Sequence, residues 1–561
     1  MATKKKNKKI QDSIKIIPIG GLHEIGKNLT AIQYRDEIII IDCGISFPTE
    51  EMFGIDVVIP DFSYLIENSE KIKGLFITHA HEDHIGAIPY LLQNINVPIY
   101  ASRLTIGFIK RKLEEHKIKK PKLHEIFPGD IIRLGSFSIE AIHTTHSVAD
   151  SLAYAINTPI GTIVHTGDFK IDYTPVDGDA IDLARFAELG KDGVQLLMCD
   201  STNAARKGFT PSESVVGESL RNIFNTIDGR IIIATFSSNV HRVQKIIDIA
   251  VETGRKVAFS GRSMEQMVSI AQDLGYLDIP ANTVVNLKKI KHVLDKELVI
   301  ITTGSQGEPM SALYRMANGA HRDVKIRKGD TVILSSTPVP GNEKSVSNIV
   351  NELFELGASV IYNDIAETHV SGHACCEELK IIHSLLKPKF FMPIHGEVRH
   401  LKANEQIALK LGLDKKNIIN ACNGNIIELY SNKVKVLDEK VPAEAIMVDG
   451  LGVGDVGATV LNERKNLAEA GCVLIAVTLD QATGEILAGP SISTRGLIFL
   501  KEYGELIKSA EDYIEEVLLM ATPEQLEDEM ALKKLLRDKM RKFIYTRTER
   551  SPMIVSIIMQ I

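Results

Sequence analysis

One short stretch of the sequence decides the fold, and it reads Thr78-His79-Ala80-His81-Glu82-Asp83-His84. It places three imidazoles and two carboxylates within six residues, directly after the apolar, strand-like run 74–77. Alternate residues of a strand point to opposite sides, so His84 joins the other ligand types only where the backbone curls after the strand. A solvated loop rich in histidine is the other interpretation, but this density of ligand types favours a metal site.

The pattern H-x-H-x-D-H resembles the signature of the metallo-β-lactamase fold, an αββα sandwich. The resemblance implies further ligands at separate strand ends, and the sequence offers His146, Asp168 and His395 after the apolar runs 137–142, 162–164 and 390–394. It implies a dinuclear site with His79, His81 and His146 on one ion, Asp83, His84 and His395 on the other, and Asp168 as the bridge. Histidine nitrogen with carboxylate oxygen suits zinc or manganese, so we expect two divalent ions, zinc first, with manganese or magnesium as alternatives.

The fourth histidine ligand has a competitor three residues earlier. His143 and His146 follow the same strand-like run. We choose His146 because Ser147 aligns with the family pattern only from that position. The loop then departs from the family, which often has proline where this chain has Ala149. This change affects the stiffness of the loop and no ligand.

Asp42 is a candidate for a supporting role near the metals. It ends the buried, strand-like run 38–41. In this fold a carboxylate at that position holds the angle and tautomer of a ligand imidazole, so its loss lowers metal affinity. The alternative is an ordinary aspartate in a turn at the end of a strand.

Further motifs narrow the resemblance. The stretches CDSTN at 199–203, HVSGH at 369–373 and PIHGE at 393–397 resemble, in order and spacing, the extra motifs of the β-CASP nucleases. TFSSNVHR at 235–242, TTGSQGEP at 302–309 and VDGLGVGDVG at 448–457 resemble the bacterial ribonuclease J family. The last stretch lies in a C-terminal region that most β-CASP relatives lack, so the resemblance covers nearly the whole chain.

The resemblance to ribonuclease J implies 5'-to-3' exonuclease activity on RNA with a preference for 5'-monophosphate ends, together with endonuclease activity, in messenger decay and ribosomal RNA maturation. Two bound ions would activate one water as the hydroxide that attacks phosphorus. His373 is the candidate general acid for the leaving 3'-oxygen, with a packing histidine as the alternative. Asp200 is expected to orient His395 or His373, and Asp83 completes the catalytic set.

A set of polar groups is expected to hold the substrate. Hydroxyl, amide and backbone N–H groups hold phosphates without reading base identity. For Ser237 and Ser238 the alternative is a plain turn after a strand. The expected substrate-binding residues are Ser237, Ser238, Asn239, His369, Val370, Ser371, Gly372 and His373.

The order of the motifs predicts the domain organisation. The late position of His395 indicates that a second domain is inserted into the first, and runs such as 230–235, 240–253, 256–260 and 263–274 give it an alternating strand and helix pattern. We expect a basic disordered tail at 1–12, a metallo-β-lactamase domain at 13–210 and 376–437, an inserted β-CASP α/β domain at 211–375, a linker at 438–450, and a small α+β domain at 451–561.

Length and composition agree with a large globular enzyme. The 561 residues exceed what one core supports, and 44% hydrophobic with 24% charged residues is typical of a soluble protein. No apolar run approaches the roughly 20 residues of a bilayer span. The basic run 4–9 lacks the apolar core of a secretory signal, so we expect a cytoplasmic protein without a membrane partner. The six cysteines form no C-x-x-C and are expected to be buried thiols.

Three rival functions follow from the same residues. A small-molecule hydrolase of this fold lacks the insertion, a DNA-directed β-CASP nuclease lacks the C-terminal region, and a non-catalytic ribonuclease J paralogue would have eroded ligands. The expected partner is single-stranded, 5'-monophosphorylated RNA. The family also implies a homodimer or homotetramer, possibly with a paralogue, through apolar helices at 500–520 and 526–536; the alternative is that these helices form the core of their own domain.

Overall fold

The computed structural model describes residues 12–49, 51–176, 178–308, 310–339, 342–363, 365–497 and 503–561. The expected basic tail lies outside these residues, apart from Asp12. Two compact units form: one contains the chain up to Phe47 and Val58–Ile446, and the other contains Pro48–Val57 and Met447–Ile561. The segment 48–57 therefore leaves the first unit and returns to it.

Two sheets form the centre of the first unit. One runs in the order β20, β19, β1, β2, β3, β5, β6, β7, and the other in the order β18, β12, β11, β10, β9, β8. The first sheet contains β1 (Ile14–Gly20), β2 (Leu29–Tyr34), β3 (Glu37–Ile41), β5 (Ile72–Phe76), β6 (Pro98–Ala101), β7 (Lys122–Glu125), β19 (Asn425–Leu429) and β20 (Val434–Lys440). The second contains β8 (Ile131–Leu134), β9 (Phe137–His143), β10 (Leu152–Thr158), β11 (Gly161–His165), β12 (Val194–Asp200) and β18 (Phe390–Ile394).

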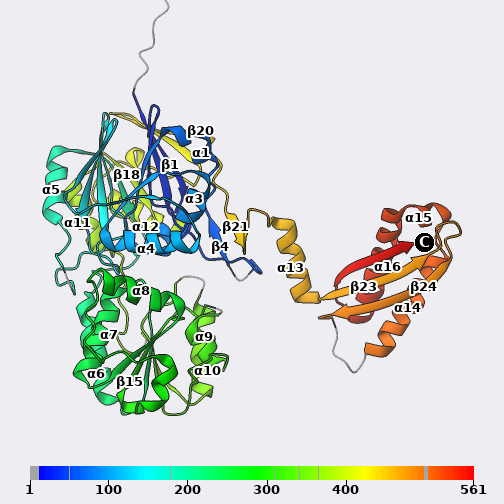
Figure 1. The fold of residues 1–561 in the computed structure, drawn as a ribbon. Helices are drawn as coiled ribbons and strands as arrows, with labels where there is room; N and C mark the ends of the chain where they lie inside the picture. Colours follow the sequence, from blue (N-terminus) through cyan, green and yellow to red (C-terminus); the bar gives the residue numbers. More distant parts are fainter. Residues whose placement is uncertain are drawn as a thin grey trace, which may run out of the picture. The chain divides into compact units, whose positions relative to one another are not determined.

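The side chains between the sheets explain why these segments are strands. Ile39 and Ile41 of β3 point into one core with Tyr154 of β10 and Leu196 of β12, while the isoleucines between them face the outer layer. Strands buried on both faces read as continuous apolar runs, as 38–41 does. Helices α5 (Leu183–Asp192), α11 (Cys376–Leu386) and α12 (Val398–Lys410) cover the second sheet, and α1 (Ser63–Glu67) and α3 (Ile88–Asn94) lie along the first (Figure 1). The expected αββα sandwich is confirmed.

The inserted part is a parallel sheet between helices, as the strand and helix pattern predicts. Its strands run in the order β14 (Lys256–Ser260), β15 (Leu298–Thr302), β13 (Ile231–Ala234), β16 (Thr331–Leu334), β17 (Ser359–Ile361). Helices α6 (Glu213–Thr226) and α7 (Val240–Glu252) lie on one side of it and α9 (Ala312–Ala317) and α10 (Glu343–Glu355) on the other (Figure 1). The carboxyl ends of β13, β15 and β16 lead into 235–239, 303–308 and 335–339, at the edge where such sheets bind ligands.

The junction of the two parts is held by one buried carboxylate. Glu378, at the start of α11, accepts hydrogen bonds from the backbone N–H groups of Ile171, Thr210 and Cys375 at 2.7 Å each. These donors lie on three separate connecting segments. After the insertion the chain enters β18, which pairs in parallel with β12 so that Asp200 lies opposite Ile394. This pairing brings His395 beside Asp200.

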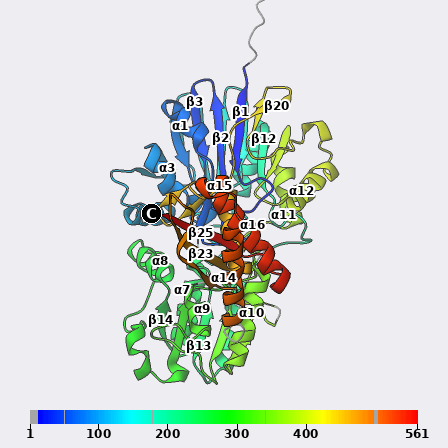
Figure 2. The same ribbon diagram turned by 90° about the vertical axis from the view of Figure 1, so that its right-hand side faces the viewer.

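The C-terminal unit is an α+β domain with one core. Its sheet runs in the order β24 (Ile486–Arg495), β23 (Cys472–Leu479), β25 (Met553–Gln560). Helices α14 (Tyr503–Leu519) and α16 (Glu529–Thr548) lie across it (Figure 2). Their apolar residues, among them Ile514 and Leu536, are buried in that core, as the alternative interpretation of these helices has it. The residues 500–502 of the expected helix lie outside the described residues.

Several local expectations need correction or extension. Strand β24 and helix α13 (Ala458–Ala470) have no counterpart among the expected elements. The six cysteines are free thiols, but Cys422 is exposed, so the expectation of buried thiols is wrong for that residue because it lies in a surface loop after α12. In the described ranges, no helix has the length and apolar character that a bilayer span requires.

Candidate metal centre and catalytic site

The backbone after β5 curls at once, as the spacing of the histidines requires. Helix α2 (Glu82–Ile85) follows the strand after a short loop and turns His84 back toward the same site. The end of β3 runs alongside, and Cys43 donates its N–H to the carbonyl of His84 at 2.8 Å. A Cβ on Gly44 would lie 1.6 Å from the carbonyl oxygen of Asp83. Only glycine permits this close approach of the two segments.

Three overlapping groups of candidate ligand atoms converge at this point, and all of them share Asp168; the third consists of Asp168, Asp200, His373 and His395. His79, His81, His146 and Asp168 form the first group, and in each group the candidate ligand atoms lie within 4.8 Å of one another. The second group consists of Asp83, His84, Asp168 and His395. Asp168 Oδ2 lies 3.7 Å from Nε2 of His79 and 3.2 Å from Nε2 of His84, one residue from each group.

The spacing of the histidine nitrogens suits bound cations. His81 Nδ1 lies 2.9 Å from Nε2 of His79 and 3.2 Å from Nε2 of His146. Neutral imidazole nitrogens that face one another repel unless a proton or a cation lies between them. Nitrogens bound to one tetrahedral zinc at its usual bond length are about 3.3 Å apart, close to these separations. The residues present therefore fit divalent metal ions.

Neighbouring groups hold the candidate ligands in place. Asp42 Oδ2 lies 2.8 Å from Nδ1 of His84. His146 Nδ1 donates to the carbonyl oxygen of Gly372 at 2.6 Å, and the hydroxyl of Thr202 lies 2.7 Å from Nδ1 of His395. In each case one ring nitrogen is engaged outside the site, so the other nitrogen is directed into it.

Charge in the site is concentrated on buried carboxylates. Burial alone would raise the pKa of Asp168, but the fields of His395 and His84 outweigh it and hold the pKa well below its ordinary value. Burial lowers the pKa of His81 to about 4 and holds the pKa of His146 well below its ordinary value. Neutral imidazoles and ionised carboxylates are the forms that bind metal.

His373 lies beside the first two ligand groups and pairs with Asp200. Its Nδ1 is 2.8 Å from Oδ2 of Asp200 and 3.9 Å from Oδ2 of Asp168. Burial lowers the pKa of His373, but these carboxylates outweigh burial and raise it above the ordinary value. Asp200 Oδ1 also lies 3.4 Å from Nδ1 of His395. Asp200 thus contacts both histidines that the sequence analysis considered for it.

The expected substrate-binding residues fall into two kinds. His369 is half-buried, and desolvation followed by the charges of Arg242, Arg206 and Lys170 holds its pKa well below the ordinary value. Ser237 and Ser238 are half-buried at the carboxyl end of β13. The other members of this set contact neighbouring parts of the protein. The Asn239 side chain caps α7 by accepting from Arg242 N–H at 3.0 Å, Ser371 Oγ accepts from Asn203 Nδ2 at 2.8 Å, Val370 is buried, and a Cβ on Gly372 would lie 2.5 Å from the His146 ring.

The structure shows where His143, the competing ligand candidate, and several supporting residues lie. His143 lies outside the ligand groups, and its Nε2 donates to the carbonyl oxygen of Asp179 at 2.7 Å. Sequence reasoning missed Asn28, whose Nδ2 donates to the carbonyl oxygen of Asp83 at 3.0 Å. It also missed Asn404, which is fully buried and donates to the carbonyl oxygen of Asp200 at 3.1 Å. No local signal in the sequence indicates Asn404.

Comparison with known proteins identifies the family. Four family models match the chain: Metallo-beta-lactamase superfamily over 25–212, Ribonuclease J, beta-CASP domain over 228–353, Zn-dependent metallo-hydrolase RNA specificity domain over 359–418, and Ribonuclease J C-terminal domain over 459–561. The chain is 44% identical to Ribonuclease J 1 of Streptococcus pyogenes over 98% of both chains. It is 40% identical to Ribonuclease J2 of Bacillus subtilis, over 99% of this chain and 100% of that one. The chain belongs to the ribonuclease J family.

Membership of the ribonuclease J family shows the reaction class. The protein is a metal-dependent hydrolytic ribonuclease with a metallo-β-lactamase domain, an inserted β-CASP domain and a ribonuclease J C-terminal domain, and it binds RNA. A solved structure of a protein of unknown function from Enterococcus faecalis has the same fold, with a TM-score of 0.53 and 16% identity over 74% of this chain and 100% of that one.

Proposed function

We propose that this ribonuclease J family member degrades RNA from the 5' end, prefers a 5'-monophosphate and also cleaves internally, in messenger decay and ribosomal RNA maturation in the cytoplasm. The observation that carries the proposal is one cluster: two ligand groups share Asp168, and His373 lies next to them. A small-molecule hydrolase of this fold lacks the inserted β-CASP domain, which this chain has.

The proposed metal ligands are the first two groups, which share Asp168. His79, His81 and His146 would hold one ion and Asp83, His84 and His395 the other, with zinc as the expected metal and manganese or magnesium as alternatives. Two such ions supply a nucleophilic water near neutral pH and neutralise charge on the phosphoryl oxygens. Asp42 keeps the His84 ring in its angle through the 2.8 Å hydrogen bond.

His373 is proposed to give its Nε2 proton to the leaving 3'-oxygen of the ribose. Asp200 accepts the Nδ1–H of the ring, which keeps the ring oriented and protonated on both nitrogens. General acid catalysis of this kind contributes about 10²- to 10⁴-fold to the rate. Asp200 also supports His395, so its loss should affect both the acid and one metal ligand.

The 5'-phosphate is proposed to bind near His369 and the serines at the end of β13. Arg242 forms an ion pair with Glu213 at 2.6 Å, so we expect it to act on the phosphate through its electric field and not through a direct contact. Hydroxyl groups of Ser237, Ser238 and Ser371 remain as the phosphate contacts. Asn239 is assigned an indirect part, since its side chain caps the helix whose N-terminus faces this site.

Self-association is proposed to occur through the C-terminal unit, between two copies of this chain. Since α14 and α16 are used inside that unit, the open face of β25 is the candidate surface. Val555, Ile557 and Met559 alternate along it with exposed fractions of 38%, 47% and 52%. Alternating apolar residues on an edge strand mark a surface that pairs or is covered.

The test compares the wild type with His81→Ala and His373→Ala. One RNA carries a 5'-monophosphate, a 5'-triphosphate or a 5'-hydroxyl, a matching DNA is included, and manganese or zinc is supplied. We expect mononucleotides from the monophosphorylated RNA with the wild type, about 10²- to 10⁴-fold slower cleavage with His373→Ala despite bound metal, and metal loss with His81→Ala. Cleavage of DNA alone would support a DNA-directed nuclease. No cleavage by metal-loaded wild type would support a structural paralogue.

A further inference from the structure

A cavity of about 170 Å³ lies beside the loop that carries His146. It is built mainly by the metallo-β-lactamase part and closed by one residue of the β-CASP part, Tyr276. Asp150 in its wall follows His146 by four residues, so the cavity wall lies at most about 14 Å from a candidate metal ligand along an extended chain. The polar and aromatic groups that line it are Ser102, Arg103, Phe127, His143, Asp150 and Tyr276.

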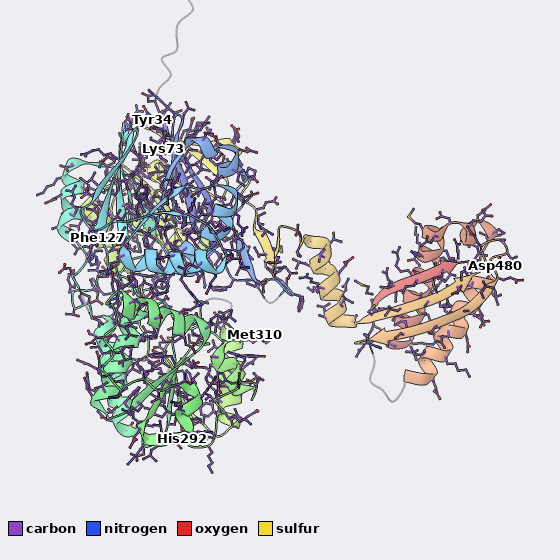
Figure 3. All side chains as sticks on the ribbon, in the orientation of Figure 1. Tyr34, Lys73, Phe127, His292, Met310 and Asp480 are labelled. Carbon is purple, nitrogen blue, oxygen red and sulfur yellow. The ribbon has the colours of Figure 1, made fainter. Side chains whose placement is uncertain are left out.

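Phe127 presents an aromatic face to solvent from a rigid turn. Its side chain is 54% exposed, and Figure 3 shows it at the rim of the metallo-β-lactamase part that borders the β-CASP part. Its N–H donates to Oδ2 of Asp130 at 2.8 Å, and Asp130 N–H donates to the carbonyl oxygen of Phe127 at 3.0 Å. Gly129 has φ of +90°, which this turn requires. A ring held in this way can stack on a planar group at little entropic cost.

Arg103 places a positive charge in the wall of the cavity. It is the first residue of α4 (Arg103–Glu115), is exposed, and forms no ion pair with any residue of the described ranges. The positive end of the helix adds to its charge. A guanidinium in this state suits a phosphate group.

The opposite wall carries hydrogen-bonding groups that are fixed by the fold. Tyr276 donates its hydroxyl hydrogen to Oδ2 of Asp150, and His143 is held by the carbonyl oxygen of Asp179. An apolar ligand would leave the Arg103 guanidinium without a partner.

We propose that this cavity binds one nucleotide of a single-stranded RNA, with its base on Phe127 and a phosphate at Arg103. The inference rests on the proposed ribonuclease function and deepens it, since it places a strand contact outside the metal cluster. Stacking and phosphate contacts do not read base edges, so binding should tolerate any sequence.

The test uses the full chain with Phe127→Ala, Arg103→Gln and the control Phe354→Ala on α10, whose ring is 51% exposed. The dissociation constant of a ten-nucleotide RNA is measured without metal at two salt concentrations. The kcat/KM values of that RNA and of a dinucleotide, both with a 5'-monophosphate, are measured with manganese. Phe127→Ala removes the proposed base stacking. It should lower the ratio of kcat/KM for the ten-nucleotide RNA to kcat/KM for the dinucleotide by about tenfold. Arg103→Gln should weaken binding and reduce its salt dependence.

The outcomes distinguish failure of this inference from failure of the proposed ribonuclease function. If the wild type cleaves neither RNA, the proposed ribonuclease function fails, and the dissociation constants still decide whether the cavity binds RNA. If both variants bind and cleave the ten-nucleotide RNA as Phe354→Ala does, the inference is overturned.

Discussion

Asp42 belongs to none of the candidate ligand groups, yet both of its oxygens form hydrogen bonds with residues of the site. Oδ1 accepts from Thr78 N–H at 2.8 Å, and Oδ2 lies 2.8 Å from Nδ1 of His84. Its backbone is in the left-handed region, with φ of +61°. At the scale of single residues, the site is therefore made of ligands and of the groups that aim them.

The variant Asp42→Asn tests this arrangement. An amide cannot serve as a charged acceptor for both Thr78 and His84, so the His84 ring should lose its fixed angle. We expect metal affinity to fall about 10- to 100-fold, measured as bound metal after dialysis against graded chelator. Asp36→Asn, at an exposed aspartate one strand earlier, is the matched control. Metal content equal to that of the wild type would contradict the assigned role.

At the scale of elements, helix α11 contains a buried histidine that must stay neutral. The His383 ring lies 4.5 Å from the ring of Phe391 in β18, and burial lowers its pKa to about 4. The unfolded chain takes up a proton near pH 6.5, while the folded chain resists it down to about pH 4. Folding is therefore favoured above pH 6.5, and this contribution is lost as the pH falls from about 6.5 to 4.

His383→Leu should remove that acid sensitivity. Between pH 6.5 and 4 the free energy of unfolding of the wild type should fall more steeply than that of the variant, by up to about 1.4 kcal/mol per pH unit. Thermal unfolding temperatures at pH 7.5 and pH 5 measure the difference. His292→Leu, at an exposed site on the β-CASP part (Figure 3), should leave the pH profile of the wild type intact. Parallel profiles for His383→Leu and the wild type would show that the proton is not taken up there.

At the scale of the whole molecule, the C-terminal unit has used its helices internally and leaves one strand face open. Ile554 of β25 points into the core, whereas Ile557 is 47% exposed on the other face. We expect Ile557→Lys to raise the dissociation constant of the proposed dimer at least tenfold, since a charge would enter an apolar contact. Sedimentation velocity over a concentration series measures this. Val436→Lys, on a strand of the first unit where the side chain is 38% exposed, should associate like the wild type; an unchanged dimer in Ile557→Lys would exclude this face.

Much of the fold and of the site could be predicted because the informative residues are chemically distinctive. The metal-type side chains follow apolar runs, and the helices near 103–116, 240–253 and 263–274 have a clear period. Strand β24 was not predicted because its exposed positions and the pair Gly489-Pro490 weaken the alternating pattern of a strand. Asn404 was not predicted because nothing in the sequence around a helical asparagine indicates which distant backbone group its side chain contacts.

The sequence alone predicts the candidate ligand side chains and the order of the domains, since both predictions follow from local chemistry and spacing. The tertiary structure was needed to show that Asp168 Oδ2 faces both ligand groups and that the carbonyl of Gly372 orients His146. These are contacts that depend on how strands far apart in the chain pair. Gly372 and His146 are separated by 226 residues, and nothing in either neighbourhood specifies the other.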